Sequence, residues 1–341
     1  MSQTPVYDVV IPIYKVKPEW IAECLDSVLA QKIQAWRVII VDGTPLEDDM
    51  ADAIAAVCLD YVNSDPRFHY LRQDADVEGV GGARNQGIAY GDAPWVAFLD
   101  GDDYWYPDHL AFIQEVLDEK DLPTWADSEL ADPLVIYTAA DTHIQMESLK
   151  GGEATSWETT IGYYPEAWRI QPTHTYFRLM GMPPITSQVV VRRDRLEAIG
   201  GFDDRLAIVE DTDCWMRVVV QHGDSKDSLA PFSPLGSVVQ CDAVGGYHRL
   251  HEANTTNAGP QTAAKYAEGG IWAKFKEAGD ICMARHPRPS AEYLTEHTPF
   301  EMKEGYADWL IAVTGGVNRP QVLKGLDDLD PDLSKPWFAP H

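Results

Sequence analysis

Short, mostly apolar runs alternate with segments of helical periodicity between residues 9 and 137. The runs are Val9–Ile13, Val38–Val41, Phe68–Leu71, Val96–Leu99 and Leu134–Tyr137. Between them, apolar residues recur every three or four positions, which is typical of helices with one buried face. Strands without polar alternation are buried on both faces, as in a parallel sheet covered by helices. We therefore expect an α/β fold with a Rossmann-like, mixed but mainly parallel sheet flanked by helices.

Polar residues come directly after three of these strands. Tyr14 follows the first run, Asp42 the second, and the acidic segment Asp100–Asp103 the fourth. Ligands of parallel α/β sheets bind beyond the carboxyl ends of the strands. The sequence therefore places these three groups on one rim of the sheet, where we expect the ligand site.

Three carboxylates occupy four successive positions in Asp100-Gly101-Asp102-Asp103. Their mutual repulsion is unfavourable unless a positive charge compensates it. Mg²⁺ and Mn²⁺ are commonly held by one or two carboxylates together with substrate phosphates. The segment therefore predicts a divalent cation beside a phosphorylated ligand, and an acidic solvent loop is the alternative.

The charge and the cysteines exclude several classes of protein. The chain has 54 Asp and Glu against 27 Lys and Arg, a formal net charge of -27, which disfavours nucleic acid and anionic membranes as partners. Its five cysteines form no C-x-x-C pair, so neither disulfides nor a structural zinc site are expected. It shows neither a secretory leader nor about 18 successive apolar residues. We expect a cytoplasmic protein without a membrane span.

The regular alternation weakens after residue 141. We interpret residues 142–186 as an irregular insertion on the acceptor side of a cleft, and strands are expected again at Val189–Val191 and within Val238–Arg249. A helix is expected from Asp211 to Val220. Earlier in the chain, Gly79, Gly81 and Gly82 predict a flexible turn before a helix that begins near Ala83.

Several short motifs occur in order along the chain. They are Val9–Tyr14, Ser27 with Gln31, Ile40–Thr44, Ala83–Gly87, Phe98–Asp103 with Pro107, Gly200–Asp203 and Glu210–Asp213. In this order and spacing they resemble the family 2 glycosyltransferases of the GT-A fold. The resemblance implies a GT-A domain at 1–256, with a nucleotide-sugar-binding half at about 7–141 and an acceptor half at about 142–256. A helical or irregular C-terminal extension, 257–341, would follow.

The resemblance also implies roles for single residues. Asp211 matches the catalytic base, and Asp102 and His251 match ligands of Mn²⁺ or Mg²⁺, with His248 as the competing ligand. The nucleotide-sugar, most often a UDP-sugar, would contact Pro12, Tyr14, Asp42, Arg84, Asp100 and Arg249. For Arg84, packing of its helix against the sheet is an equally good interpretation.

Two departures from the family pattern narrow the expectation. Only one acid, Asp42, precedes Gly43, where many members have two, so a nucleoside contact at Asp42 is less firmly implied. The Gln-x-x-Arg-Trp motif of processive synthases is absent, which favours transfer of a single sugar. Transfer by direct displacement needs a metal to neutralise the leaving diphosphate and a base opposite it, which inverts the anomeric centre.

Two other functions fit parts of the pattern. A HAD-like phosphohydrolase would use Asp100 as its nucleophile, but such enzymes carry that acid after the first strand rather than the fourth. A non-catalytic nucleotide-sugar-binding protein would have no need of Asp211. The acceptor could be a glycan, a protein, a metabolite or a modified nucleic acid, and the sequence does not distinguish among them or define the oligomeric state.

Overall fold

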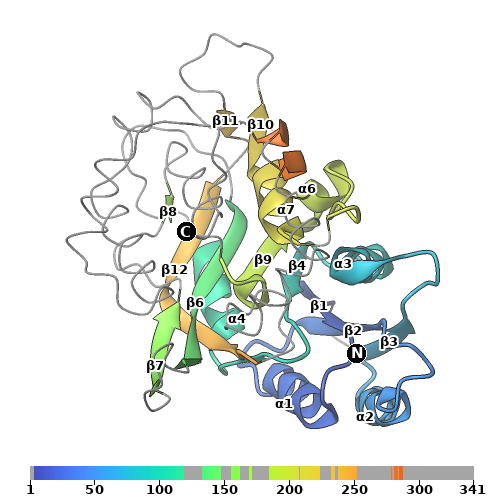
Figure 1. Cartoon of the computed structure of the whole chain (residues 1–341). Coiled ribbons are helices and arrows are strands. Elements are labelled where there is room, and N and C mark those ends of the chain that lie inside the picture. The colour runs from blue at the N-terminus through green and yellow to red at the C-terminus, as the bar shows by residue number, and fades with distance from the viewer. Residues whose placement is uncertain are drawn as a thin grey trace.

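The computed structural model describes residues 4–118, 133–146, 155–161, 169–170, 184–206, 208–222, 232–234, 237–251, 278, 280–282 and 284–286. A single sheet of ten strands runs through this part of the chain, in the order β3-β2-β1-β4-β9-β6-β12-β5, with β7 beside β6 and β8 beside β12 (Figure 1). Its strands are β1 (Tyr7–Ile13), β2 (Trp36–Asp42), β3 (Phe68–Arg72), β4 (Trp95–Phe98), β5 (Tyr104–Trp105), β6 (Pro133–Met146), β7 (Thr155–Ile161), β8 (Arg169–Ile170), β9 (Val189–Arg192) and β12 (Ser237–His248). A separate pair is formed by β10 (Val220–His222) and β11 (Phe232–Pro234).

The first four strands form the parallel part of the sheet. β1 pairs in parallel with β2 on one side and with β4 on the other, and β3 extends the sheet beyond β2. All seven residues of β1 are buried, as expected for a strand covered on both faces. The α/β fold expected from the sequence is confirmed.

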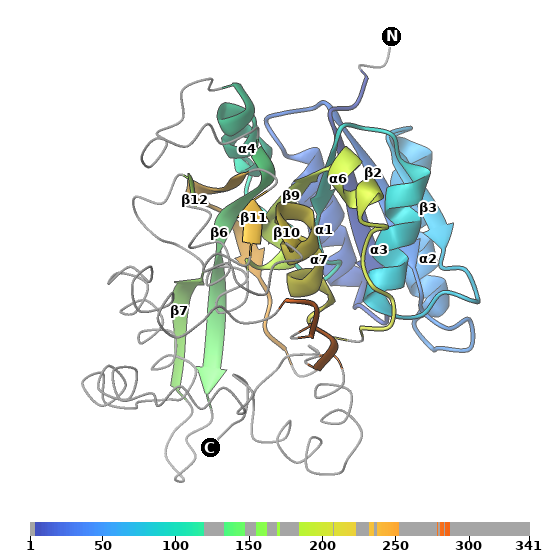
Figure 2. The same ribbon diagram turned by 90° about the horizontal axis from the view of Figure 1, so that it is seen from above.

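Helices cover both faces of this sheet (Figures 1 and 2). They are α1 (Pro18–Leu29), α2 (Ala51–Ser64), α3 (Gly79–Tyr90), α4 (His109–Asp118), α6 (Arg193–Ala198) and α7 (Glu210–Val219). Val9 points into a core with α1, α2 and α4, whereas Val10 points into a second core with α3, α6 and α7. Successive residues of a strand face opposite sides, so one apolar run supplies both cores.

The second half of the sheet is mixed. β9 is antiparallel to both β4 and β6, and β12 is parallel to β6. A short 3-10 helix, η1 (Thr186–Gln188), leads directly into β9. These pairings bring η1 next to the carboxyl end of β4. The end of β12 lies beside the residues that follow β4.

The expectation of a flexible turn at Gly79, Gly81 and Gly82 was wrong. α3 already begins at Gly79, which has a φ of 72°, so the glycines form its first turn. A Cβ at Gly82 would lie 2.4 Å from Val77, and one at Gly87 would lie 2.5 Å from Val10. The glycines therefore let the helix lie close to its neighbours, and they do not interrupt it.

The expectation of an irregular segment at 142–186 was wrong in part. β6 continues to Met146 and pairs with the antiparallel β7, and β8 pairs with β12. These strands are rich in Thr and lack an apolar period, so the sequence pattern does not reveal them, although β-branched residues favour strands. The rest of 142–183 lies outside the described residues, as does most of the expected extension 257–341.

Two further expectations concern disulfides and membrane spans. All five cysteines are free and buried. Within the described ranges, none of the helices has the length and apolarity that crossing a bilayer requires.

Candidate active site

The carboxyl ends of β1, β2 and β4 meet at one edge of the sheet. The last residue of β1, Ile13, is in register with Asp42, the last residue of β2, and Asp100 follows β4 after one intervening residue. Tyr14, just past β1, is 63% exposed, so its ring is open to solvent beside this edge. A Cβ at Gly101 would lie 3.3 Å from the carbonyl oxygen of Pro12, so Gly101 allows the acidic turn to approach β1.

Asp42 is fully buried, and the protein itself saturates its carboxylate. Oδ1 accepts a hydrogen bond from the Thr44 backbone N–H at 2.8 Å, and Oδ2 accepts one from the Tyr70 hydroxyl at 2.7 Å. Arg72 forms an ion pair with the same Oδ2. Asp42 therefore orders the end of β2 and the Arg72 side chain, which limits any direct contact it could make with a ligand.

Arg84 joins two acidic segments from its place in α3. The side chain is only 3% exposed, and its two terminal nitrogens each donate at 2.8 Å, one to Asp100 Oδ1 and the other to Glu210 Oε1. Burial would lower the pKa of Arg84, but the charges of Asp100 and Glu210 raise it, so the guanidinium stays charged. Through Arg84, the acidic turn after β4 is fixed to the start of α7.

Glu210 and Asp211 open α7 as neighbouring acids. Burial raises the pKa of Glu210 well above its usual range, the nearby charge of Asp211 raises it further, and Arg84 opposes the shift. Asp211 is only partly buried, and its Oδ2 accepts a hydrogen bond from the Thr186 hydroxyl at 2.9 Å. Its Oδ1 accepts the Thr212 backbone N–H at 2.6 Å. Asp211 is thus held in place while remaining accessible.

Two successive residues of η1 tie the acidic turn to this base candidate. Thr186 donates to Asp211, as described, and Ser187 donates from its hydroxyl to Asp103 Oδ2. The Ser187 oxygen also accepts the Asp100 backbone N–H at 3.1 Å. Adjacent residues of η1 therefore connect Asp211 to the acidic turn.

Asp102 lies against His251, which follows β12. The His251 Nε2 is 2.8 Å from Asp102 Oδ2, and each side chain is about one-fifth exposed, 20% and 19% respectively. The His251 ring is also 4.8 Å, centroid to centroid, from the indole of Trp20 in α1. Two metal-ligating atom types that lie 149 residues apart in the sequence therefore meet at one point.

Asp103 fastens the end of β12 to the same turn. It is 1% exposed, its Oδ1 accepts the Arg249 backbone N–H at 2.7 Å, and its Oδ2 lies 3.2 Å from His248 Nδ1. Burial would lower the pKa of His248, but the neighbouring carboxylates, Asp103 first, raise it. His248 therefore serves Asp103, and of the two histidines it is His251 that reaches Asp102.

Arg249 points along the acidic turn. Its Nε donates to the Asp102 carbonyl oxygen at 2.8 Å, and its terminal nitrogen forms an ion pair with the half-exposed Glu23. The guanidinium carbon lies 5.0 Å from the Trp20 ring centroid and 5.9 Å from that of Tyr104. A permanent positive charge is thus held beside the expected metal site on an aromatic platform.

The sequence did not single out Thr186, Ser187 or Trp20. Hydroxyl residues before an apolar strand are common, and the link from Thr186 and Ser187 to two distant acids depends on β9 being antiparallel to β4. Trp20 lies on α1 beside Ile21, at the border between the buried and exposed faces of the helix. These residues become visible only once the sheet order is known.

Residues 8–123 match the family model for glycosyl transferase family 2. This segment belongs to glycosyl transferase family 2. The resemblance that the motifs suggested is thereby confirmed, and the segment contains the acidic turn, Arg84 and the ends of β1 and β2. His251 and Asp211 lie beyond the matched residues.

Two relatives show the extent of the likeness in sequence. A glycosyltransferase of Bacillus subtilis, EpsJ, is 36% identical over 29% of this chain and 27% of its own length. The succinoglycan biosynthesis protein ExoW of Rhizobium meliloti is also 36% identical, over 30% of this chain and 31% of its own. The chain therefore aligns with only about a third of the length of these relatives.

A solved structure extends the likeness of fold. The crystal structure of S. aureus TarS residues 1–349 is 16% identical to this chain, covers 88% of it and 74% of the TarS chain, and has a TM-score of 0.53. At this identity the similarity concerns the fold alone. The curled, mixed sheet with helices on both faces is shared well beyond residue 123.

Proposed function

We propose that the chain is a metal-dependent, inverting glycosyltransferase that moves one sugar from a nucleoside diphosphate donor, a UDP-sugar, to an acceptor hydroxyl. The observation that carries this proposal is the meeting of Asp102 with His251, beside Asp100. The contacts of Arg84, Thr186 and Ser187, which connect the start of α7 to the acidic turn, support a role for Asp211 in the same site. Family 2 membership of residues 8–123 supports the reaction class.

The donor set at Asp102 and His251 suits Mn²⁺ or Mg²⁺. The His251 Nε2 and Asp102 Oδ2 atoms lie 2.8 Å apart, so both could bind one cation. The carboxylate suits either ion, and the imidazole nitrogen favours Mn²⁺ over the harder Mg²⁺. When bound, the cation would neutralise the charge that develops on the departing diphosphate.

The remaining groups of the rim would hold the nucleotide. Arg249 offers its guanidinium to the diphosphate in exchange for the exposed Glu23, because a doubly charged phosphate attracts it more strongly. Tyr14 presents an open ring on which a base could stack. Asp100 keeps one carboxylate oxygen clear of Arg84, and that oxygen suits a ribose hydroxyl. Asp42 and Pro12 would stabilise the ends of β2 and β1 on which the nucleotide lies.

Asp211 would act as the catalytic base. Its carboxylate lies in the first turn of α7 and is oriented by the Thr186 hydroxyl. Glu210 is less suited to this role, because it is buried and its carboxylate is held by Arg84. With the base opposite the diphosphate, the acceptor hydroxyl would lose its proton to Asp211 as it attacks, and the anomeric configuration would invert.

The other two functions expected from the sequence have less support. A phosphohydrolase nucleophile at Asp100 would have its Oδ1 engaged by Arg84, which weakens it as a nucleophile. A pure binding protein would not require the ordered Asp211.

The five free cysteines fit a reducing compartment such as the cytoplasm.

A thermal-shift screen of nucleotide-sugars tests this proposal. In the presence of Mn²⁺, UDP-sugars should raise the melting temperature because a ligand that binds only the folded state stabilises it. The effect should vanish in Asp102→Ala and persist in Asp60→Ala, a control on the exposed face of α2. Stabilisation of Asp102→Ala equal to that of the wild type would count against the metal assignment.

A further inference from the structure

Short helical pieces within 278–286, described at residues 278, 280–282 and 284–286, pack against the loop that leads into α7. They lie far beyond the family 2 segment, yet Figure 1 shows them beside α7. One apolar cluster joins them to the loop, and the members of this cluster are Leu206, Ile208, Val209, Ala278 and Ile281. The loop that directly precedes the helix of the proposed base is therefore covered by a distant part of the chain.

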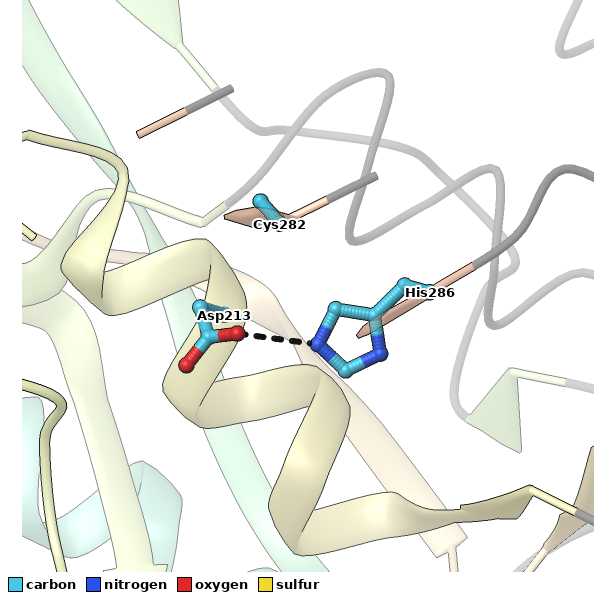
Figure 3. A group of neighbouring side chains, drawn as sticks. All are labelled: Asp213, Cys282 and His286. Atoms are coloured by element: carbon cyan, nitrogen blue, oxygen red, sulfur yellow. Dashed lines mark hydrogen bonds and ion pairs between the residues drawn. The ribbon is translucent and has the colours of Figure 1, made fainter. Parts of the chain in front are cut away.

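Asp213, in the first turn of α7, is the polar centre of this contact. It is fully buried, and Figure 3 shows His286 directed at its carboxylate. The His286 Nε2 lies 3.1 Å from Oδ1, and Arg217 Nε donates to Oδ2 at 2.7 Å. One terminal nitrogen of Arg285 lies 2.6 Å from both carboxylate oxygens. Two of these three partners come from the 278–286 stretch.

Arg285 also reaches the other end of the loop. Its second terminal nitrogen donates to Asp203 Oδ2 at 2.6 Å. Asp203 stands just after the Gly200-Gly201 turn, whereas Asp213 lies within α7. A single guanidinium therefore ties together both ends of the segment that contains Glu210 and Asp211.

That segment contains a strained residue. Val209, immediately before Glu210, has a φ of 53°, a left-handed conformation that is unfavourable for a β-branched side chain. Its carbonyl oxygen accepts the Asp213 backbone N–H at 3.0 Å. Such a conformation persists only where the surrounding structure imposes it. Here the apolar cluster and the Arg285 contacts surround it.

The contact around Asp213 also brings together a metal-ligating combination of side chains, but the neighbouring charges argue against a metal. The ligand atoms of Asp213, Cys282 and His286 lie within 4.8 Å of one another. However, the guanidinium groups of Arg217 and Arg285 already neutralise Asp213 and would repel a cation. Burial raises the pKa of Cys282 to about 12, so its thiol stays protonated and is a poor ligand.

We propose that residues 278–286 act as a latch on the N-terminus of α7, in which Arg285 is a positioning residue for Asp211. The consequence for catalysis rests on the proposed function, because it takes Asp211 as the base. The structural role of the latch does not depend on the proposed function, because the latch holds the strained loop whatever reaction the site performs.

Hydrogen–deuterium exchange on the full-length protein tests the structural role of the latch. Arg285→Gln should raise amide exchange in peptides covering 206–216 while exchange in β1 and β2 stays unchanged. The matched control is Arg205→Gln, because Arg205 also pairs with Asp203 but is 67% exposed and has no contact with Asp213 in the described structure. Unchanged exchange at 206–216 in Arg285→Gln, or an equal rise in Arg205→Gln, would overturn the latch.

Turnover tests the consequence for Asp211. With Mn²⁺ and UDP-glucose or UDP-N-acetylglucosamine, release of UDP should fall about tenfold or more in kcat for Arg285→Gln, because small displacements of a reacting group are costly. The Kd for UDP with Mn²⁺ should stay within about twofold, and Arg285→Lys should recover part of the rate. A fall in UDP affinity with unchanged kcat would overturn the positioning role.

Two further results separate the possible failures. If the wild type releases UDP from neither donor, the proposed function has failed for these donors, and the exchange experiment still decides the latch. Stoichiometric zinc in the purified protein that is lost in Cys282→Ser would overturn the ion-pair latch in favour of a metal site.

Discussion

Asp103 is the residue whose replacement should reveal most about how the site is held together. Asn keeps its size but offers one acceptor oxygen in place of two. Three groups approach the carboxylate: the Arg249 backbone N–H, the Ser187 hydroxyl and His248 Nδ1. Turned one way, the amide presents its NH₂ group to the Arg249 N–H, which loses its acceptor; turned the other way, the Ser187 hydroxyl and His248 lose the charged oxygen that they now face.

The magnitude follows from these contacts. A hydrogen bond to a charged group contributes about 1.5–3 kcal/mol, so Asp103→Asn should lower the free energy of unfolding by at least that amount. The end of β12 would be released from the acidic turn, and His251 would no longer be held against Asp102. Losing such support typically weakens metal binding by about 10–100-fold.

Urea unfolding at pH 7.5 and calorimetric titration of Mn²⁺ with UDP measure the two effects. Asp60→Asn on the surface of α2 is the control, and it should leave both quantities unchanged. If Asp103→Asn unfolds within about 0.5 kcal/mol of the wild type and binds Mn²⁺ with the same affinity, the linking role assigned to Asp103 is refuted.

Three further predictions concern the base, the pH dependence and the packing of α3. Asp211→Asn should leave UDP binding intact and lower kcat by about 10²–10⁴-fold, so near-normal turnover would remove Asp211 as the base. His109 is fully buried, and burial lowers its pKa from 6.5 to about 3. Because the unfolded chain gains a proton at this histidine below pH 6.5 and the folded protein does not, the stability of the folded state decreases as the pH falls from 6.5 towards 3. Between pH 7.5 and 4.5, wild-type stability should therefore fall by about 3 kcal/mol relative to His109→Asn, and parallel pH–stability curves would contradict this. Gly87→Ala would place a Cβ 2.5 Å from Val10 and should lower stability by about 1–3 kcal/mol in chemical denaturation, whereas an unchanged midpoint would show that α3 moves freely.

The parallel half of the fold could be predicted because its strands are continuous apolar runs. Each run supplies residues to two cores, as Val9 and Val10 do, so polar residues are excluded and the pattern is clear. The rim of the site followed from the same rule, since Tyr14, Asp42 and Asp100 each come after such a strand. The helix of Asp211 was also recognisable, because apolar residues follow the two acids at helical spacing.

Other parts could not be predicted because they depend on contacts between distant segments. The strand β7 pairs with the end of β6 through a sequence without apolar alternation. Ser187, which donates to Asp103, lies 84 residues further along the chain, and Thr186 lies 25 residues before its partner Asp211. The strain at Val209 has no sequence signal, since valine itself disfavours a positive φ.

The central claim is that a divalent cation at Asp102 and His251 governs binding of the donor's diphosphate. Calorimetric titration of UDP into the full-length protein, with Mn²⁺ and then with EDTA, measures this most directly. We predict binding with Mn²⁺, at least about tenfold weaker binding with EDTA, and no effect of Mn²⁺ in Asp102→Ala. UDP binding of equal affinity with and without Mn²⁺ in the wild type would contradict the account.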